Sequence, residues 1–511
     1  MEFKSIKELR EYLRRYNSNS FLEVGTSVCW QEWQNGGPRI SPLEQAIKNS
    51  RRNYALRLIL LASAGNPYRN QAITFQEFES LIDVLFNCPN HTISDKTLLD
   101  TEAEYTFNYL HTWEQDNYKT VRNWKLLLSD IFTKELIRKN GGDLFSTRQA
   151  LFQNSGFGKT LARVQRTMKV FEILNSIDLN TINFFESSTK LNHEFYFVQF
   201  MSSIGYFLKT RFRGGGVLDF KKSFDIDFDD ELKSKGYTEE NLRIFVRLNS
   251  RVFSSSDRDS FRNIVTERLN NTSEVYHPFF YNSFLDYPFI DLGQDKYCLP
   301  DPYSLMDSSW NIICKHLPSS NKILDQAFEQ YLANVLLPII APNCFEKIRE
   351  VENPQSSQDK RADFLITLPN VYIIIECKNS LMSSDTSVYF DPKGLASLWG
   401  RIHGATEQIS STIEALKLKD KPVIPLILTF YDALLASNVF ESIVKSTDYC
   451  DHLNLSMPPI VRSLHEFEHW IYNRSLQNWA ESMLLKQSNS SINPDNQGHN
   501  YRHFKDIIID I

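Results

Sequence analysis

Residues 361–380 read RADFLITLPNVYIIIECKNS, and this stretch decides the fold of the C-terminal third of the chain. Two apolar segments flank the turn dipeptide Pro369-Asn370, a pattern that predicts a β-hairpin. With a two-residue turn, the register of the hairpin sets Asp363 directly opposite Glu376. Residues that oppose each other in this way share a sheet face, with Cβ atoms about 4.5–5.5 Å apart.

An acidic pair of this kind needs a cation close by, because two carboxylates held across a β-ladder repel each other. Mg²⁺ takes oxygen ligands and is often held by one or two carboxylates together with a substrate phosphate. Lys378 stands two positions after Glu376 and therefore shares its sheet face. An ammonium group there can position a water molecule or stabilise the charge of a phosphate in its transition state. The hairpin thus predicts a site for a divalent metal ion and a phosphodiester.

The other positions of the hairpin predict a buried central strand. The segment VYIIIECK at 371–378 is apolar on both faces, as is typical of strands covered on both sides. The face opposite the acidic pair is a predicted core face that carries Ala362, Phe364, Ile366, Val371, Ile373 and Ile375.

Outward from the hairpin, the hydrophobic spacing alternates between the helix and strand periods from about residue 320 onward. This alternation is typical of an α/β layer with a mixed central sheet. The predicted helices span 323–337, 395–418 and 465–472, and the predicted strands span 345–351, 362–368, 371–378 and 423–430, with PPIVRSL as a further strand-like segment.

An Asp, a hairpin and then Glu-x-Lys at the end of the next strand resemble the PD-(D/E)XK nuclease superfamily, which has the restriction-endonuclease-like fold. The resemblance covers about residues 320–475, and Ala362 stands where the name-giving Pro often lies. It implies that Asp363 and Glu376 bind metal together with the backbone carbonyl of Cys377. It also implies that Lys378 orients the attacking water.

The same resemblance points to residues on the two flanking helices. Glu329, in LDQAFEQYLANVL, looks like the helical Glu of many members and would bind a second metal ion or hold solvent. Asp325 lies one turn earlier and could serve equally well. Gln408 and Arg401, in the helix after the Lys, are candidates to face the site. A plain surface or structural role remains the alternative for Glu329, Gln408 and Arg401.

An acid-x-Lys triplet is weak evidence by itself, because roughly four are expected by chance in a chain of this composition. The pair Glu376/Lys378 differs from the others because it ends a β-branched run and has an Asp across a hairpin. The other triplets are Glu2/Lys4, Asp219/Lys221, Glu231/Lys233 and Asp391/Lys393.

The rest of the chain predicts a different organisation. Residues 1–275 carry apolar residues at spacings of three and four and predict a mainly α-helical region, with a possible division into two subdomains near 140–155. Residues 276–319 are aromatic and Pro-rich, and we interpret them as a connector with short strands. The nuclease-like domain is expected over 320–475, and 476–511 is expected to be a C-terminal tail.

A basic stripe in the N-terminal region is a candidate contact for nucleic-acid phosphates. Lys159, Arg163, Arg166 and Lys169 fall on one face of a predicted helix. A solvated helix face is the alternative and is at least as common for such a stripe. Arg401 is the corresponding nucleic-acid candidate in the C-terminal domain.

Composition adds limits on the environment. The chain has 511 residues and a net charge of -6, so any basic binding surface must be local. None of the seven cysteines forms a CxxC pair, which favours a reducing, cytoplasmic location over a disulfide framework. The charged N-terminus and the absence of a long apolar run predict no membrane segment.

Together these features predict an endonuclease that depends on Mg²⁺ or Mn²⁺, with DNA as the expected substrate. Its expected setting, by analogy with the fold, is a bacterial restriction or antiphage defence effector. A homo-oligomer or a defence-system partner subunit would fit that setting. The alternatives are a non-cleaving nucleic-acid-binding or assembly subunit on the same fold, and a ribonuclease.

Overall fold

The described residues of a computed structural model separate into two compact units, with the boundary between Ser319 and Ser320. The structure describes residues 6–34, 55–56, 58–59, 69, 71–87, 157–178, 180–209, 216–221, 230–252, 287–307, 309, 316–317, 321–349, 351, 360–379, 392–430, 449–464, 467–468, 471 and 475–488.

The C-terminal unit is built on a five-stranded sheet with the order β5-β6-β7-β8-β9. β5, β6 and β7 run antiparallel to one another, whereas β7, β8 and β9 are parallel. The expected mixed central sheet is therefore confirmed. The strands are β5 (Phe345–Lys347), β6 (Phe364–Thr367), β7 (Tyr372–Lys378), β8 (Val423–Thr429) and β9 (Ile460–Ser463).

The hairpin between β6 and β7 has the expected register. The N–H of Leu368 donates to the carbonyl of Val371 at 3.0 Å, which closes a two-residue turn. The ladder ends at the pair Phe364 and Ile375. Every residue of the expected core face is buried, and β7 is covered on both sides as its apolar sequence predicts.

Asp363 departs from the predicted pairing by one step. It lies just before β6, outside the ladder, and its N–H donates to the carbonyl of Ile375 at 3.0 Å. The strand bends here, so Asp363 meets the end of β7 through its side chain instead of as a paired residue.

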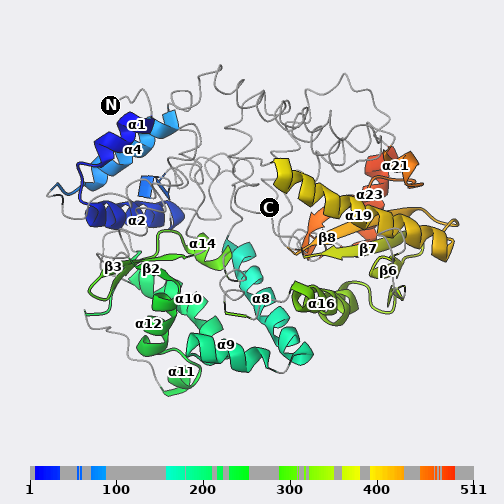
Figure 1. Ribbon diagram of the computed structural model, residues 1–511, viewed down its shortest axis with the longest axis horizontal. Coiled ribbons are helices and arrows are strands. Elements are labelled where there is room, and N and C mark those ends of the chain that lie inside the picture. The colour runs from blue at the N-terminus through cyan, green and yellow to red at the C-terminus, as the bar shows by residue number, and fades with distance from the viewer. Residues whose placement is uncertain are drawn as a thin grey trace. The chain divides into compact units, whose positions relative to one another are not determined.

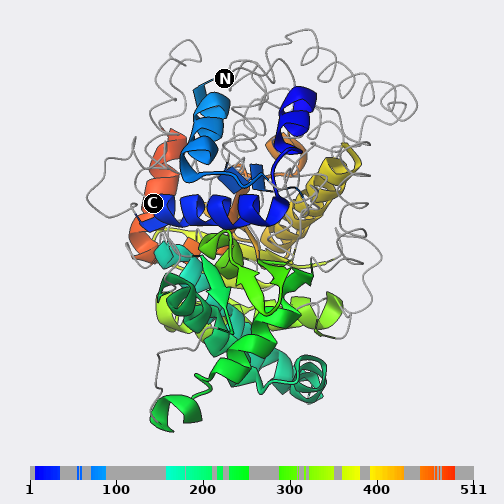
Figure 2. The ribbon, with the colours of Figure 1, turned by 90° about the vertical axis from the view of Figure 1, so that its left-hand side faces the viewer.

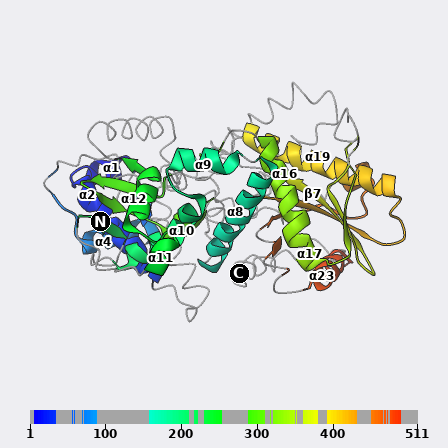
Figure 3. The ribbon, with the colours of Figure 1, turned by 90° about the horizontal axis from the view of Figure 1, so that it is seen from below.

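Helices cover the sheet on both sides, as Figures 1 and 3 show for α16 (Asn321–Tyr331) and α19 (Pro392–Leu416). A π-helical turn, η3 (Leu332–Leu336), joins α16 to the short α17 (Leu337–Ile340). Pro338 has no N–H group, so one α-helical hydrogen bond is missing at this point. α21 (Tyr449–His452) and α23 (Leu476–Ser488) complete the described helices of this unit.

The C-terminal tail was expected to begin at residue 476, but the chain is still helical there. Residues 476–488 form α23, and its side chains Leu476, Trp479, Ala480 and Met483 are buried. Their burial adds this helix to the core of the C-terminal unit, because the apolar side chains repeat at the helical spacing. The remaining tail positions, 489–511, lie outside the described residues.

The N-terminal unit contains many helices, as expected, and also a four-stranded sheet with the order β1-β4-β3-β2. Figure 2 shows α2 (Ser18–Gln34) alongside this sheet. The strands are β1 (Val217–Asp219), β2 (Ser250–Val252), β3 (Phe289–Gly293) and β4 (Lys296–Cys298). The other helices are α1 (Ile6–Leu13), α4 (Phe75–Asn87), α8 (Phe157–Ile177), α9 (Thr181–Thr189), α10 (His193–Lys209), α11 (Asp230–Ser234), α12 (Glu239–Leu248) and α14 (Pro302–Asp307).

The described part of 276–319 contains short strands, as expected, but it belongs to the N-terminal unit and is not a connector. β3, β4 and α14 all lie in it, and the two strands form the middle of the sheet. Phe289, Tyr297 and Leu299 pack in a buried cluster with Phe207 and Phe245 from the helices. The aromatic residues of this region therefore belong to the core of the N-terminal unit and do not indicate a linker.

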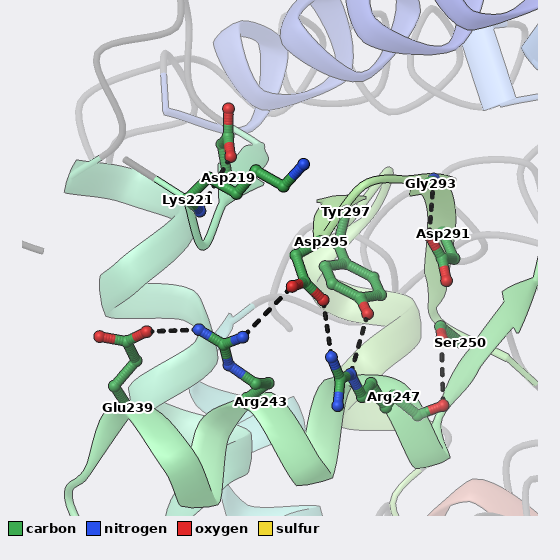
Figure 4. A network of polar contacts seen from close by, with 10 residues as sticks. All are labelled: Asp219, Lys221, Glu239, Arg243, Arg247, Ser250, Asp291, Gly293, Asp295 and Tyr297. Atoms are coloured by element: carbon green, nitrogen blue, oxygen red, sulfur yellow. Dashed lines mark hydrogen bonds and ion pairs between the residues drawn. The ribbon is translucent and has the colours of Figure 1, made fainter. Parts of the chain in front are cut away.

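A polar network holds the β3–β4 turn of the N-terminal unit to α12 (Figure 4). Gln294 and Asp295 both have positive φ, 56° and 60°, as a tight two-residue hairpin turn requires. The Asp295 carboxylate accepts hydrogen bonds from Arg247 at 2.7 Å and from Arg243 at 3.3 Å. Arg243 also pairs with Glu239 at 2.7 Å, so one helix face fixes the turn.

We expect Asp295→Asn to lower the free energy of unfolding of this unit by about 0.5–1 kcal/mol at pH 7, the range of partly exposed ion pairs. Asn tolerates positive φ, so the turn itself is kept. The hydrogen bond from Arg247 holds the pKa of Asp295 below its usual value of 3.8. The stabilisation is thus present above that value and is lost as the pH falls through the lowered pKa.

Denaturant unfolding of the wild-type chain and the variant at pH 7 and near pH 3 measures this effect. The difference between the two proteins should shrink at the lower pH. If the difference in the free energy of unfolding were equal at both pH values, the cause would be the geometry of the turn and not the charge of Asp295.

Within the part of the chain that the structure describes, no helix has both the length and the apolar character needed to cross a membrane.

Candidate active site

The ends of two strands and one helix bring the predicted residues of the C-terminal unit together. Asp363 lies just before β6, and Glu376, Cys377 and Lys378 end β7. Gln408 projects from α19, which packs on β7 and β8. The sheet and the helix therefore hold the catalytic candidates on regular elements, which fixes them more firmly than loops would.

The Asp363 carboxylate is tied to the neighbouring strand. Its Oδ2 accepts a hydrogen bond from the backbone N–H of Cys377 at 2.7 Å. Burial raises the pKa of Asp363 above its usual value, although the hydrogen bond from Cys377 and the charge of Lys378 work in the opposite direction. The acid is thereby held beside Glu376, which lies next to Cys377 in β7.

Glu376 is the most confined acid of the site. Only 3% of it is exposed. Its Oε1 forms an ion pair with Lys378, whereas its Oε2 is buried with no hydrogen-bond partner in the described structure. Burial and then the nearby charge of Asp363 raise the pKa of Glu376 well above its usual range, against the opposing effect of Lys378.

Lys378 is held between two oxygen atoms. Its Nζ donates to Glu376 Oε1 and to Gln408 Oε1, the latter at 3.1 Å. Burial acts to lower the pKa of Lys378, but the charge of Glu376, its hydrogen bond and the charge of Asp363 together outweigh burial, and the pKa is raised. The group is thus a charged ammonium at neutral pH. It has three donor positions, and these two contacts use two of them.

Gln408 lies at this site, as the resemblance implied. It is 6% exposed, so the alternative of an ordinary surface residue does not describe it. One turn later, Thr412 Oγ1 donates to the Gln408 carbonyl at 2.7 Å and accepts from the N–H of Ala362 at 2.9 Å. Sequence reasoning missed Thr412. Its spacing of four from Gln408 was the available signal.

Glu329 does not complete a three-carboxylate group with the acidic pair. Its Oε2 pairs with Lys347 Nζ from β5 at 3.2 Å. Its charge still adds to the raised pKa of Glu376, after burial and the larger effect of Asp363, so the two acids are neighbours. Among the described residues, no group of three or more His, Cys, Asp or Glu side chains is arranged to hold a metal ion.

Asp325, the alternative to Glu329, lies near enough to Lys378 for that charge to act on it. Burial raises its pKa, while a hydrogen bond from the Asn379 side chain and the charges of Lys378 and Arg401 act to lower it. Arg401 itself is exposed on α19. Of the two acids from α16, Asp325 therefore contacts the segment that carries the Lys, and Glu329 pairs with β5.

The acidic pair fits a divalent ion. Glu376 Oε2 is a buried carboxyl oxygen that no described donor satisfies, and such an atom is costly to bury without a cation or a hydrogen bond. Asp363 and Glu376 supply the oxygen ligands that Mg²⁺ and Mn²⁺ accept. The carbonyl of Cys377 would be the third protein ligand.

No family model matches the chain, and no curated protein and no solved structure matches it. The assignment of the site therefore depends on the residues and their geometry.

The basic stripe of the N-terminal unit does not form a continuous exposed face. Arg166 is buried, at 6% exposure, because α8 packs against α10 and α14. Lys169 is exposed but pairs with Glu172 at 2.8 Å. The side chains of Lys159 and Arg163 lie outside the described residues. Arg166 is therefore not an exposed phosphate contact, as the stripe predicted, but part of the packing of α8.

Proposed function

We propose that this protein is a metal-dependent nuclease that hydrolyses phosphodiester bonds, with DNA as the expected substrate. The observation that carries the proposal is the buried, unsatisfied Glu376 Oε2 beside Asp363, with the Lys378 ammonium on the same site. An acidic pair next to a charged lysine on rigid strands suits phosphoryl chemistry, because that chemistry needs positioning and charge stabilisation.

The layout of the elements also supports the proposal. A helix with acids, an antiparallel hairpin that carries Asp363 and Glu376, and a second helix with Gln408 follow one another around a mixed sheet. This order agrees with the resemblance to the PD-(D/E)XK superfamily and its restriction-endonuclease-like fold. We therefore include that fold in the proposal for residues 320–475.

The chemistry follows from the protein's own groups. Asp363 and Glu376 would hold Mg²⁺ or Mn²⁺, with the Cys377 carbonyl. When bound, the ion supplies Lewis-acid stabilisation of the negative charge that develops on the phosphate. Lys378, fixed by Glu376 and Gln408, directs its remaining donor to the attacking water or to a phosphate oxygen.

In the reaction, the water oxygen forms a bond to phosphorus as the bond from phosphorus to the leaving oxygen breaks. The leaving oxygen takes up a proton and becomes a hydroxyl, and the water loses one. The products are a phosphate monoester and a free hydroxyl end. Lys378 stays protonated throughout. Burial acts to lower its pKa, but Glu376 and the other nearby groups raise it further, so the net shift is upward.

The setting of this activity is also a proposal. By analogy with the fold, the protein would act in bacterial restriction or antiphage defence, and the N-terminal unit would recognise nucleic acid, a partner subunit or another copy of the chain. A non-cleaving nucleic-acid-binding or assembly subunit is the competing function. A binder has no need for an opposed acidic pair with an unsatisfied oxygen.

Cleavage assays test the proposal. The purified full-length chain is incubated with plasmid, linear duplex DNA, single-stranded DNA and RNA, with Mg²⁺, with Mn²⁺ or with chelator. We expect metal-dependent cutting by the wild type and a loss of at least about 100-fold in Glu376→Gln. Glu346→Gln, an exposed acid on β5, is the matched control and should cut normally.

The outcomes separate the functions. Metal-dependent cutting of RNA alone would make the protein a ribonuclease. Binding to DNA without cutting, unchanged by Glu376→Gln, would support the non-cleaving subunit and contradict the nuclease.

A further inference from the structure

Two buried oxygen atoms without a hydrogen-bond partner belong to residues at and just after the end of β7. They are Glu376 Oε2 and Asn379 Oδ1. In the described part of the C-terminal unit, these are the only buried side-chain polar atoms of this kind. Burying an acceptor without a donor destabilises a fold, so such atoms are expected where a ligand or solvent supplies the partner.

Asp325 fixes the orientation of the Asn379 amide. A carboxylate can only accept hydrogen bonds, so the Asn379 side chain must direct its NH₂ group toward Asp325. The carbonyl Oδ1 of the same planar amide then points away from Asp325. The charges of Lys378 and Arg401 also act on Asp325 and oppose the rise in its pKa that burial causes.

Asp325 connects Asn379 to the reacting groups, because it accepts from the Asn379 side chain and is near enough to Lys378 for that charge to act on it. The Lys378 ammonium is engaged by Glu376 on one side and by Gln408, at 3.1 Å, on another. The site thus combines a positive donor, Lys378, with a fixed neutral acceptor, Asn379 Oδ1. A water molecule between them can donate to the acceptor and present its lone pair to a phosphate.

We propose that Asn379, oriented by Asp325, is a positioning residue that accepts a hydrogen bond from the attacking water. This inference rests on the proposed nuclease function and deepens it. The role of Asn379 is to fix the direction of attack, whereas Asp363 and Glu376 hold the metal ion.

The test compares Asn379→Leu with the wild type in the full-length chain. Leu has a similar volume and removes only the polar atoms. We expect kcat to fall by about 10- to 100-fold, as for other residues that orient a reacting group, with KM unchanged. We expect the melting temperature without metal to stay the same or rise, because an unsatisfied acceptor is removed.

A charge exchange provides a second variant. Asn379→Asp alone sets two carboxylates against each other and should lower kcat. Combining it with Asp325→Asn restores a donor at position 325 and an acceptor at position 379, and should recover most of the lost kcat. Failure of this pair to recover activity would contradict an acceptor role for position 379.

Two further results would overturn the inference. A lower melting temperature of Asn379→Leu with normal kcat would show that the amide only supports the fold. Loss of the Mn²⁺-induced rise in melting temperature in the same variant would make Asn379 a metal ligand.

Failure of the proposed function is distinguishable from failure of the inference. A wild-type chain that cuts no nucleic acid contradicts both. A wild-type chain that cuts, together with an Asn379→Leu variant that cuts equally well, contradicts the inference alone.

Discussion

Asp363→Asn is expected to lower metal-dependent cleavage by about 10³-fold, since one of the two carboxylates for the ion is lost. The same change should leave the metal-free chain as stable as the wild type, or more stable by on the order of 1 kcal/mol. Asn can still accept the hydrogen bond that Cys377 N–H gives to Asp363 Oδ2 at 2.7 Å. It also removes a negative charge that faces Glu376.

The dependence on pH gives a sharper form of this prediction. Burial raises the pKa of Asp363 above its usual 3.8 in the folded state, so the folded state binds the proton more tightly than the unfolded state does. This contribution to stability is complete below 3.8 and is lost as the pH rises through the raised pKa. Asn does not titrate, so the advantage of the variant should grow with pH over that range.

Cleavage rates and denaturant unfolding at several pH values measure both effects. The matched control is Asp420→Asn, an exposed acid that contacts Tyr372 at the opposite end of β7. It should cut at the wild-type rate. If Asp363→Asn cuts normally, or if it loses stability at neutral pH, the acidic pair is not the metal site proposed for it.

Lys378→Met is expected to lower both activity and stability. The lost ammonium should reduce cleavage by about 10²–10³-fold, as the removal of one electrostatic contact to a transition state does. Glu376, 3% exposed, loses its only cationic partner in the described structure. Breaking the pair should cost about 2–3 kcal/mol, less than for a fully buried pair, since Lys378 retains 23% side-chain exposure.

The metal ion should distinguish Lys378→Met from Asp363→Asn. The Lys378→Met variant keeps both carboxylates that would bind the metal ion. Mn²⁺ at about 100 times its dissociation constant would therefore raise the free energy of unfolding of this variant by about 2.7 kcal/mol. Asp363→Asn should gain much less from Mn²⁺.

Thermal unfolding with and without Mn²⁺, together with cleavage rates, tests this prediction. The control is Lys421→Met, a lysine that donates to the Leu368 carbonyl at 3.2 Å and lies over the Tyr372 ring. It contacts only neutral groups there and should affect neither the activity nor the response to metal. The prediction of lower stability would be contradicted if the Lys378→Met variant were as stable as the wild type without metal. Glu376 would then be neutral once the ammonium group is removed.

The sequence predicted the sheet and the site well around 361–380 because short-range rules govern that segment. A two-residue turn and alternating apolar residues leave one register, and the ladder from Phe364 to Leu368 follows it. Gln408 was also placed correctly, since its helix must pack on the strand that carries Lys378.

Errors arose where distant contacts decide the structure. The strands at 289–298 are short, and besides pairing with each other they pair with segments more than 35 residues away in sequence, such as Ser250–Val252. Arg166 lies in a basic stripe, yet neighbouring helices bury it. Helical spacing alone does not reveal which face of α8 is covered.

By itself, the sequence determined the hairpin, its register from Phe364 onward, and the identity of the acidic pair and its lysine. These depend on the alternation of side chains along a strand, which is a local property of the backbone. Only the tertiary structure decided that Glu329 turns to Lys347 and that Asp325 orients Asn379. Those choices depend on where helix α16 packs on the sheet, which burial and side-chain volume across the whole unit set.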